Sequence, residues 1–419
     1  MRKYWACPII WIALLACIGL SACSSDSQSP VVMDASASEA GTSNSSGIVV
    51  VNSNYSESSV SFLDRDGNLL HDGCFNSGTG ATGLSPTLSG DVVLPTQVPS
   101  GGPVVLIDRD KVFNTLTWLD PVTCTPLRQL AVGTGFNANP HDVVTLSASK
   151  AYVTRCNENK AATPAPDDFD DGNDLLIIDP SQPKILGRID LKPFAPAGVL
   201  PDADRALLAE GIVYVSLNAI SSDYAIYGTG RIVMVDPVAD KVVGWIDLPG
   251  AKDCGAMTYL AAERKLMVAC NGSYSDVQQA DTSAIVTIDL SVSPPAVITQ
   301  VAAASVRGLP FSNTSLAAWD SNTAFGVTNG DASNLPPDRL WSLPQGGALP
   351  VEVFESAEGW ALGAVLADAQ NGRVLVADGT KLTPAFLRFF DFASGIFTAS
   401  KTVKTNPSRN LPPRALAWY

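Results

Sequence analysis

Short apolar runs rich in β-branched residues recur along this 419-residue chain, and most of them close on Asn or Asp. Each repeat contains one such run, a loop, a second run, a tight turn and a third run. Apolar runs of this kind, bounded by turn residues, predict β-strands. Clear copies occupy residues 150–191, 211–248, 264–301 and 372–403, and weaker copies occupy residues 47–75, 103–132 and 322–354. One further short strand is expected before each copy, which gives four strands in each of seven units.

Four-stranded units in tandem predict an all-β fold, a seven-bladed β-propeller that spans residues 47–419. The first copy begins at residue 47 without a leading strand, whereas residues 414–419 form a final strand that has no repeat of its own. We therefore expect the C-terminal strand to complete the first blade and to close the ring.

The N-terminus has the layout of a secretory signal: Arg2 and Lys3, an apolar run at 4–20, and then small residues before Cys23. The run is just short of the about 20 residues that span a bilayer. The motif Leu-Ser-Ala-Cys resembles the bacterial lipobox, which implies a signal peptide at 1–22 and a lipid, such as palmitate, on Cys23. Two alternatives remain, an uncleaved membrane anchor and a shorter motif that ends at Cys17.

Residues 23–46 are rich in Ser, Ala and Gly, a composition typical of a flexible tether. The predicted protein is therefore held in a bacterial cell envelope by its lipid anchor alone. In families that use the lipobox, an Asp after the cysteine often retains the protein in the inner membrane. Ser24 follows Cys23 here, so the outer membrane is favoured.

Charge and histidine content exclude several classes of function. The formal net charge is −14 at pH 7, which opposes nucleic-acid binding because that binding requires Lys and Arg on phosphates. His71 and His141 are the only histidines, which excludes a multi-histidine metal site. No Cys-x-x-Cys-His motif for haem attachment occurs.

The strand sequences resemble those of the YVTN/YncE-like propellers. The runs "AYVTRCNEN" and "LLIIDP" at 151–159 and 175–180 match the tyrosine-valine strand of that family and the strand that follows it. Lactonase-type propellers and quinohemoprotein amine dehydrogenase subunits are distant members of the same broad group. The resemblance implies the propeller fold over nearly all of the chain after the tether, but the fold hosts many activities.

The expected loops are unequal and indicate which face of the propeller is functional. Connections between second and third strands are long, and in a propeller they share a face with the connections between blades. Long loops on a rigid scaffold often carry binding residues. Residues expected where the innermost strands begin on this face are His141, Asp142, Asp202, Asp204, Asp253, Asn313, Glu358 and Arg414.

Converging carboxylates at a channel mouth suit a cation, a metal or a sugar. The alternative is that solvated acids simply surround the channel of an acidic protein. His141 and Asp142 are the candidate catalytic residues, with His141 as a general base or a ligand, although a structural histidine is the alternative reading.

The loop "DDFDDGND" at 167–174 places Asp168, Asp170, Asp171 and Asp174 around a glycine. Calcium takes six to eight oxygen ligands, and such a loop can supply several of them. The sequence predicts no cofactor firmly, and calcium is the candidate. The alternative is an ordinary solvated acidic loop.

Five cysteines follow Cys23, and export permits disulfides. Cys254 begins an expected inner strand and Cys270 ends its antiparallel partner, so we expect these two to face each other and form a disulfide. The pairing of Cys74, Cys124 and Cys156 stays open.

These observations favour a non-catalytic binding or scaffolding module that takes a protein, a glycan or a small ligand on its long-loop face. The alternative is an enzyme at the channel mouth, either a lactonase-like hydrolase or a dehydrogenase subunit. Membership of a larger envelope complex is a third possibility.

Overall fold

The structure is a computed structural model that describes residues 46–79, 87–161, 163–276, 278–320, 322–329, 336–344, 348–380 and 384–419. Outside these residues lie the expected signal peptide at 1–22, the expected lipidation site Cys23 and the expected tether except for Ser46. Among the helices that are described, none has the length and apolar character needed to span a membrane.

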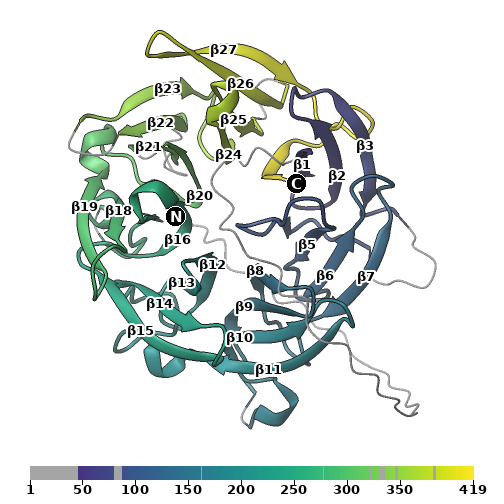
Figure 1. Cartoon of the computed structure of the whole chain (residues 1–419), viewed down its shortest axis with the longest axis vertical. Coiled ribbons are helices and arrows are strands. Elements are labelled where there is room, and N and C mark those ends of the chain that lie inside the picture. The colour runs from purple at the N-terminus through teal and green to yellow at the C-terminus, as the bar shows by residue number, and fades with distance from the viewer. Residues whose placement is uncertain are drawn as a thin grey trace. The chain divides into compact units, whose positions relative to one another are not determined.

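Seven antiparallel four-stranded sheets surround a common centre, as the sequence predicts (Figure 1). Blade 1 contains β28 (Pro413–Trp418), β1 (Gly47–Ser53), β2 (Ser58–Asp64) and β3 (Leu69–Asn76), and blade 2 contains β4 (Val92–Val93), β5 (Val104–Asp108), β6 (Thr115–Leu119) and β7 (Pro126–Ala131). Blade 3 contains β8 (Pro140–Ser147), β9 (Lys150–Glu158), β10 (Gly172–Asp179) and β11 (Lys184–Asp190), and blade 4 contains β12 (Ala203–Ala209), β13 (Ile212–Leu217), β14 (Gly230–Asp236) and β15 (Lys241–Leu248).

Blade 5 contains β16 (Cys254–Leu260), β17 (Lys265–Cys270), β18 (Ala284–Asp289) and β19 (Ala296–Ala302). Blade 6 contains β20 (Phe311–Asp320), β21 (Thr323–Thr328), β22 (Arg339–Pro344) and β23 (Val351–Glu355), and blade 7 contains β24 (Leu362–Asp368), β25 (Arg373–Asp378), β26 (Phe386–Ala393) and β27 (Ile396–Val403). Short 3-10 turns occur at η1 (Pro166–Asp168), η2 (Lys192–Phe194), η3 (Ala261–Glu263), η4 (Gln279–Thr282), η5 (Ala303–Val306) and η6 (Ala369–Asn371).

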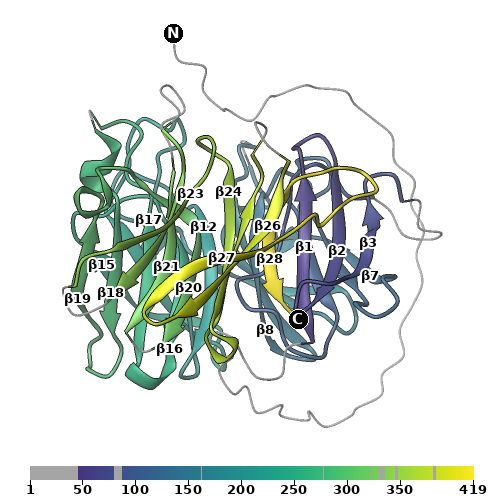
Figure 2. The same ribbon diagram turned by 90° about the horizontal axis from the view of Figure 1, so that it is seen from above.

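The ring closes between the two ends of the propeller. β28 pairs antiparallel with β1, with Ile48 opposite Trp418 and Val50 opposite Leu416. The N–H of Tyr419 donates to the carbonyl of Gly47 at 3.1 Å. Figure 2 shows β28 and β1 side by side. The expectation that the C-terminal strand completes blade 1 is therefore confirmed.

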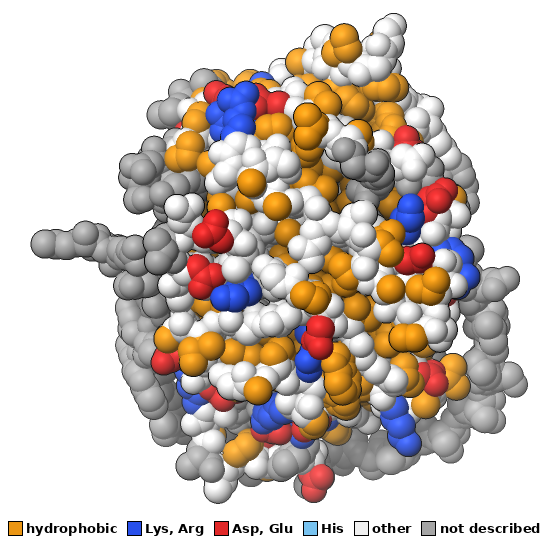
Figure 3. Space-filling view, turned by 90° about the vertical axis from the view of Figure 1, so that its left-hand side faces the viewer, with side chains coloured by type: hydrophobic (Ala, Val, Ile, Leu, Met, Phe, Trp, Pro, Cys, Tyr) orange, Lys and Arg blue, Asp and Glu red, His pale blue; other side chains and the backbone are white. Residues whose placement is uncertain are grey.

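The hydrophobic core lies between neighbouring blades. One cluster joins Leu207 and Ile232 of blade 4 to Met257 and Leu266 of blade 5. Because each sheet is covered on both faces, middle strands such as β10 are buried along their whole length, which explains the apolar runs in the sequence. Outer strands are partly exposed, and on the outer wall apolar side chains are interspersed with charged ones (Figure 3).

Two disulfides reinforce the blades. Cys254 and Cys270 are opposite each other in β16 and β17 with a Cα–Cα distance of 3.9 Å, the pair that the sequence predicts. Cys74 in β3 joins Cys124 in the β6–β7 turn and so ties blade 1 to blade 2. Cys156 is the free cysteine among the described residues.

Candidate functional site

The strand ends divide the connections between two faces of the propeller. Residues 159–171, 218–229 and 271–283 connect second and third strands, whereas the β8–β9 and β10–β11 turns on the opposite face are short. The connections between blades share the face of the long loops, as expected. We call this face the long-loop face, and we call the region where the innermost strands begin there the mouth.

Bulges interrupt the innermost strands close to the mouth. The β8–β9 register shifts between Pro140 and Asp142, and the β12–β13 register shifts between Ala203 and Ala206. β16, β20, β24 and β28 shift in the same way near their first residues. A bulge re-aims a side chain away from the regular alternation of a strand. The bulged positions include His141, Asp204, Asn313 and Arg414, which are four of the candidates that the sequence singles out.

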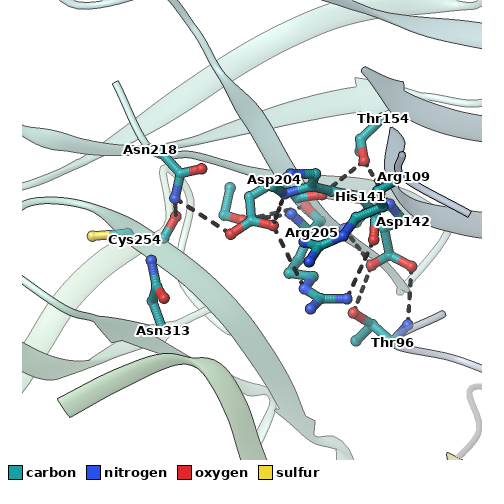
Figure 4. A network of polar contacts seen from close by, with 12 residues as sticks. Thr96, Arg109, His141, Asp142, Thr154, Asp204, Arg205, Asn218, Cys254 and Asn313 are labelled. Carbon is teal, nitrogen blue, oxygen red and sulfur yellow. Dashed lines mark hydrogen bonds and ion pairs between the residues drawn. The ribbon is translucent and has the colours of Figure 1, made fainter. Parts of the chain in front are cut away.

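His141 and Asp204 form the central pair of the mouth (Figure 4). His141 Nδ1 lies 2.6 Å from Asp204 Oδ1, and the guanidinium Nε of Arg205 lies 3.6 Å from the same oxygen. Burial alone raises the pKa of Asp204, but the positive charge and hydrogen bond of His141 outweigh it and lower that pKa to about 2. His141 Nε2 makes no hydrogen bond to any residue that the structure describes.

Asp142 is a neighbour of this pair but has a different environment. It is fully buried and accepts hydrogen bonds from the Thr96 backbone N–H and hydroxyl and from the Ala206 N–H. Burial raises its pKa. These contacts join blades 2, 3 and 4 and occupy both oxygens of Asp142, so its role is structural. His141 is therefore the better catalytic candidate of the two.

Asp253 and Asp202 lie beside the His141–Asp204 pair. Asp253 Oδ1 accepts hydrogen bonds from Asn218 Nδ2 at 2.9 Å and from Asn313 Nδ2 at 3.0 Å. Asn218 Nδ2 also lies 3.3 Å from Asp204 Oδ2, so one amide joins the two carboxylates. Burial and the charge of Asp204 raise the pKa of Asp253 to about 8, and burial and Glu158 raise that of Asp202 to about 7.

The structure separates the remaining candidates from this network. Arg414 in blade 1 stacks over Tyr55, 5.3 Å from the ring centre, and its Nη1 donates to the Trp360 carbonyl at 3.4 Å. Glu358, between blades 6 and 7, accepts a hydrogen bond from the Thr380 hydroxyl. The mouth therefore has an acidic side on blades 3 to 6 and a second side on blades 7 and 1.

The sequence analysis did not predict the contacts of the segment that follows β4. This inner strand has only two residues, after which Thr96 contacts β8 and Gln97 exchanges two hydrogen bonds with the backbone of Leu208 in β12. Blade 2 is thereby linked directly to blade 4. Pro95 and Pro99 could have indicated that this inner strand is short, because proline cannot continue a central strand.

The calcium expectation finds no geometric support. Asp171 forms ion pairs with Arg188 and Lys192, and Asp174 is held by Arg155 and Arg188. Within the described ranges, no three Asp, Glu, His or Cys side chains are grouped so as to hold a metal ion. Basic side chains thus pair with two of the four acids of this loop, Asp171 and Asp174, and no ion pair of Asp168 or Asp170 with a described residue accompanies them.

No protein-family model matches the chain, and no curated protein matches it in sequence. Solved structures do match. A Bacteroides fragilis protein provisionally assigned as a 6-phosphogluconolactonase has a TM-score of 0.56 at 10% identity, covering 90% of this chain and 99% of that one. The periplasmic gluconolactonase of Pseudomonas aeruginosa has a TM-score of 0.50 at 11% identity, covering 89% and 98%.

Hydrazine synthase from Kuenenia stuttgartiensis is also similar, with a TM-score of 0.50 at 12% identity over 80% of this chain and 92% of that one. Proteins of different function share the architecture, and identities this low show the fold alone. The chain is thus a seven-bladed β-propeller that resembles the lactonase-type propellers, and its function must be argued from its own mouth.

The raised pKa of Asp253 predicts how stability depends on pH. Between about pH 4 and pH 8 the unfolded chain releases the Asp253 proton while the folded chain retains it, so the free energy of unfolding falls as pH rises, by up to about 1.4 kcal/mol per pH unit from this group. Asp253→Asn keeps the neutral shape. We expect this variant to match the wild type at pH 4 and to be more stable at pH 8.

Urea denaturation from pH 4 to pH 9 measures this difference. Asp281→Asn, a change at an exposed carboxylate on the same face, serves as the control and should follow the wild type. Equal pH profiles for wild type and Asp253→Asn would show that Asp253 is ionised in the folded chain at neutral pH.

Proposed function

We propose that the protein is an exported, lipid-anchored binding module that takes a small polar ligand at the mouth of its propeller. The signal-like N-terminus and Leu-Ser-Ala-Cys motif support export and anchoring through Cys23. The disulfides Cys74–Cys124 and Cys254–Cys270 support an oxidising compartment. A periplasmic enzyme among the similar structures agrees with that location.

The distribution of exposed aromatic side chains carries the proposal. Six such side chains are exposed in the described parts of the chain: Tyr55, Tyr224, Trp245, Tyr274, Trp360 and Phe392. Four of them, Tyr55, Tyr224, Tyr274 and Trp360, are on connections of the long-loop face. Exposed rings of this kind are typical of binding surfaces, because they bury a large area at low entropic cost.

These rings adjoin the polar groups of the mouth. The rings of Tyr274 and Tyr227 are 6.4 Å apart, and the charge of Asp253 contributes to raising the pKa of both hydroxyls. Arg414 stacks over the Tyr55 ring and donates to the backbone carbonyl of Trp360. A ligand with an apolar face and several polar groups fits this combination of rings, carboxylates and amides.

Hydrolysis at the mouth is the second candidate function. With its proton on Nδ1, His141 donates to Asp204, and Nε2 then carries a lone pair that no described residue uses. A carboxylate that orients histidine in this way is a recurring arrangement for a general base. The similarity to a gluconolactonase suggests a lactone as the first substrate to test.

The lipid anchor can be tested with metabolic labelling. Expressed in a bacterium, the chain should incorporate a palmitate probe and fractionate with membranes, and Cys23→Ser should abolish labelling and release the protein. Cys17→Ser is the matched control and should behave as the wild type. Membrane retention of Cys23→Ser without label would instead identify an uncleaved anchor.

The binding surface can be tested with paired aromatic variants. In a thermal-shift screen of the purified full-length chain against sugars, amines and amino acids, ligands that stabilise the wild type should lose at least tenfold in affinity in Tyr274→Ala or Trp360→Ala. Trp245→Ala, on outer strand β15, should bind normally. If all three variants retained full affinity, the long-loop face would not be the binding surface.

If the protein is a hydrolase, the full-length chain should hydrolyse glucono-δ-lactone. A pH-stat titration of the acid that is released measures this reaction. Removing a general base slows such reactions about 10²- to 10⁴-fold, so His141→Asn should do so while His71→Asn does not. His71 is a suitable control because it lies in β3, the outer strand of blade 1, where its ring contacts the carbonyl of Val122 in blade 2. No turnover above the uncatalysed rate would leave the binding function alone.

A further inference from the structure

Asp253 is a buried acid of the mouth that forms no ion pair with a described residue. It is only 7% exposed, and two neutral amides, from Asn218 and Asn313, donate to its Oδ1. Its Oδ2 accepts no hydrogen bond from a described residue, and no described Lys, Arg or His pairs with it. Asp204 has His141 as a partner. Asp142 and Asp202 also lack an ion pair, but backbone N–H groups donate to both of them, whereas only two side-chain amides donate to Asp253.

Other titratable groups around Asp253 increase its need for a cation. Those whose charges interact with it, from every neighbouring element, are Asp202, Asp204, Cys156, Tyr227 and Tyr274. None of these side chains is a cation at any pH. Positive charge supplied by a ligand would therefore offset both the burial of Asp253 and its repulsion by Asp204.

Tyr227 and Tyr274 supply a second feature that favours a cation. Both are on long loops, one in blade 4 and one in blade 5, and their ring planes are inclined by 54°. The face of a tyrosine ring is negative and attracts an ammonium group within about 6 Å. Exposed Tyr224 is in the same loop as Tyr227.

The donors around Asp253 favour an organic cation over a metal ion. Calcium needs six to eight oxygen ligands, and the described chain has no group of acids that could hold a metal. Asn218 and Asn313 both present N–H groups to the carboxylate, and these groups cannot serve as metal ligands. An ammonium needs only an acceptor, such as Oδ2. A neutral sugar brings no charge to compensate Asp253.

We propose that Asp253, with Tyr227 and Tyr274, forms a subsite for an organic ammonium group, the cationic end of the ligand that the proposed function places at the mouth. The ammonium donates to Asp253 Oδ2 and lies against the tyrosine rings. This inference rests on the proposed function and narrows it to amine-bearing ligands.

Binding of the cation is coupled to proton release. Near pH 7 the empty site holds a proton on Asp253, whose pKa is about 8, and an ammonium binds only after that proton leaves. Affinity should therefore rise about tenfold per pH unit up to pH 8 and then level off. A neutral ligand would show neither the proton release nor this rise.

Calorimetry with n-butylammonium chloride as the probe tests the subsite on the full-length chain. At pH 7, titrations in phosphate and in MOPS, buffers of different ionisation enthalpy, should show about one proton released per ligand bound. The neutral isostere n-butanol should bind at least tenfold more weakly. Asp253→Asn should lose at least tenfold in affinity and all of the pH dependence, and Tyr274→Leu about two- to fivefold.

Glu263→Gln, on the opposite face, is the matched control and should leave binding unchanged. Thermal melts of each variant establish that it is folded. Binding that is independent of pH, or equal in Asp253→Asn, would overturn the subsite. If sugars bound at the mouth and n-butylammonium did not, the ammonium inference would fall while the binding function stood; if mouth variants affected no ligand, the binding function itself would fall.

Discussion

Backbone pairing between β28 and β1 closes the ring, and the packing of blade 1 against blade 7 depends on that closure. A single blade cannot bury either face alone, so its apolar side chains are stable only between two neighbours. At the joint, Leu416 of β28 and Ile48 of β1 pack in one cluster with Leu375 and Phe389 of blade 7. Without β28, blade 1 would lose its inner strand and blade 7 would lose part of its covering surface.

Closure also brings the beginnings of the innermost strands together. Buried aspartates on this face have one of two kinds of partner, backbone N–H groups or side chains. Asp142 and Asp338 accept backbone N–H groups from a neighbouring blade, so their hydrogen bonds hold blades together. Asp204 and Asp253 interact with side chains instead. A buried carboxylate that accepts backbone N–H groups has a structural role. A carboxylate that is paired with His141, or that has no cationic partner, can respond to a ligand.

The sequence was sufficient to predict the features that repeat. Strand periodicity identified the blades, the orphan strand at 414–419 identified the closure, and the positions of Cys254 and Cys270 at opposite ends of adjacent strands identified their disulfide. Features that depend on contacts between blades were not predictable. Cys74–Cys124 joins two blades, and the different roles of Asp142 and Asp204 follow from bulges of one or two residues that leave no mark in an apolar pattern.

Gly255 shows how closely the mouth geometry is constrained. A Cβ at this position would lie 2.4 Å from Asp204 Oδ2 and 2.4 Å from the Asn313 carbonyl oxygen, so any other residue would push apart the blades that hold the network. Asp253 and Asp202 meanwhile adopt left-handed backbone conformations, with φ of 52° and 47°, which Asp tolerates better than most residues but which remain less favourable than the extended form. Backbone strain and an uncompensated buried acid both lower stability, and neither is needed to close a propeller. Their coincidence at one point of the ring is the pattern expected where a fold gives up stability for recognition.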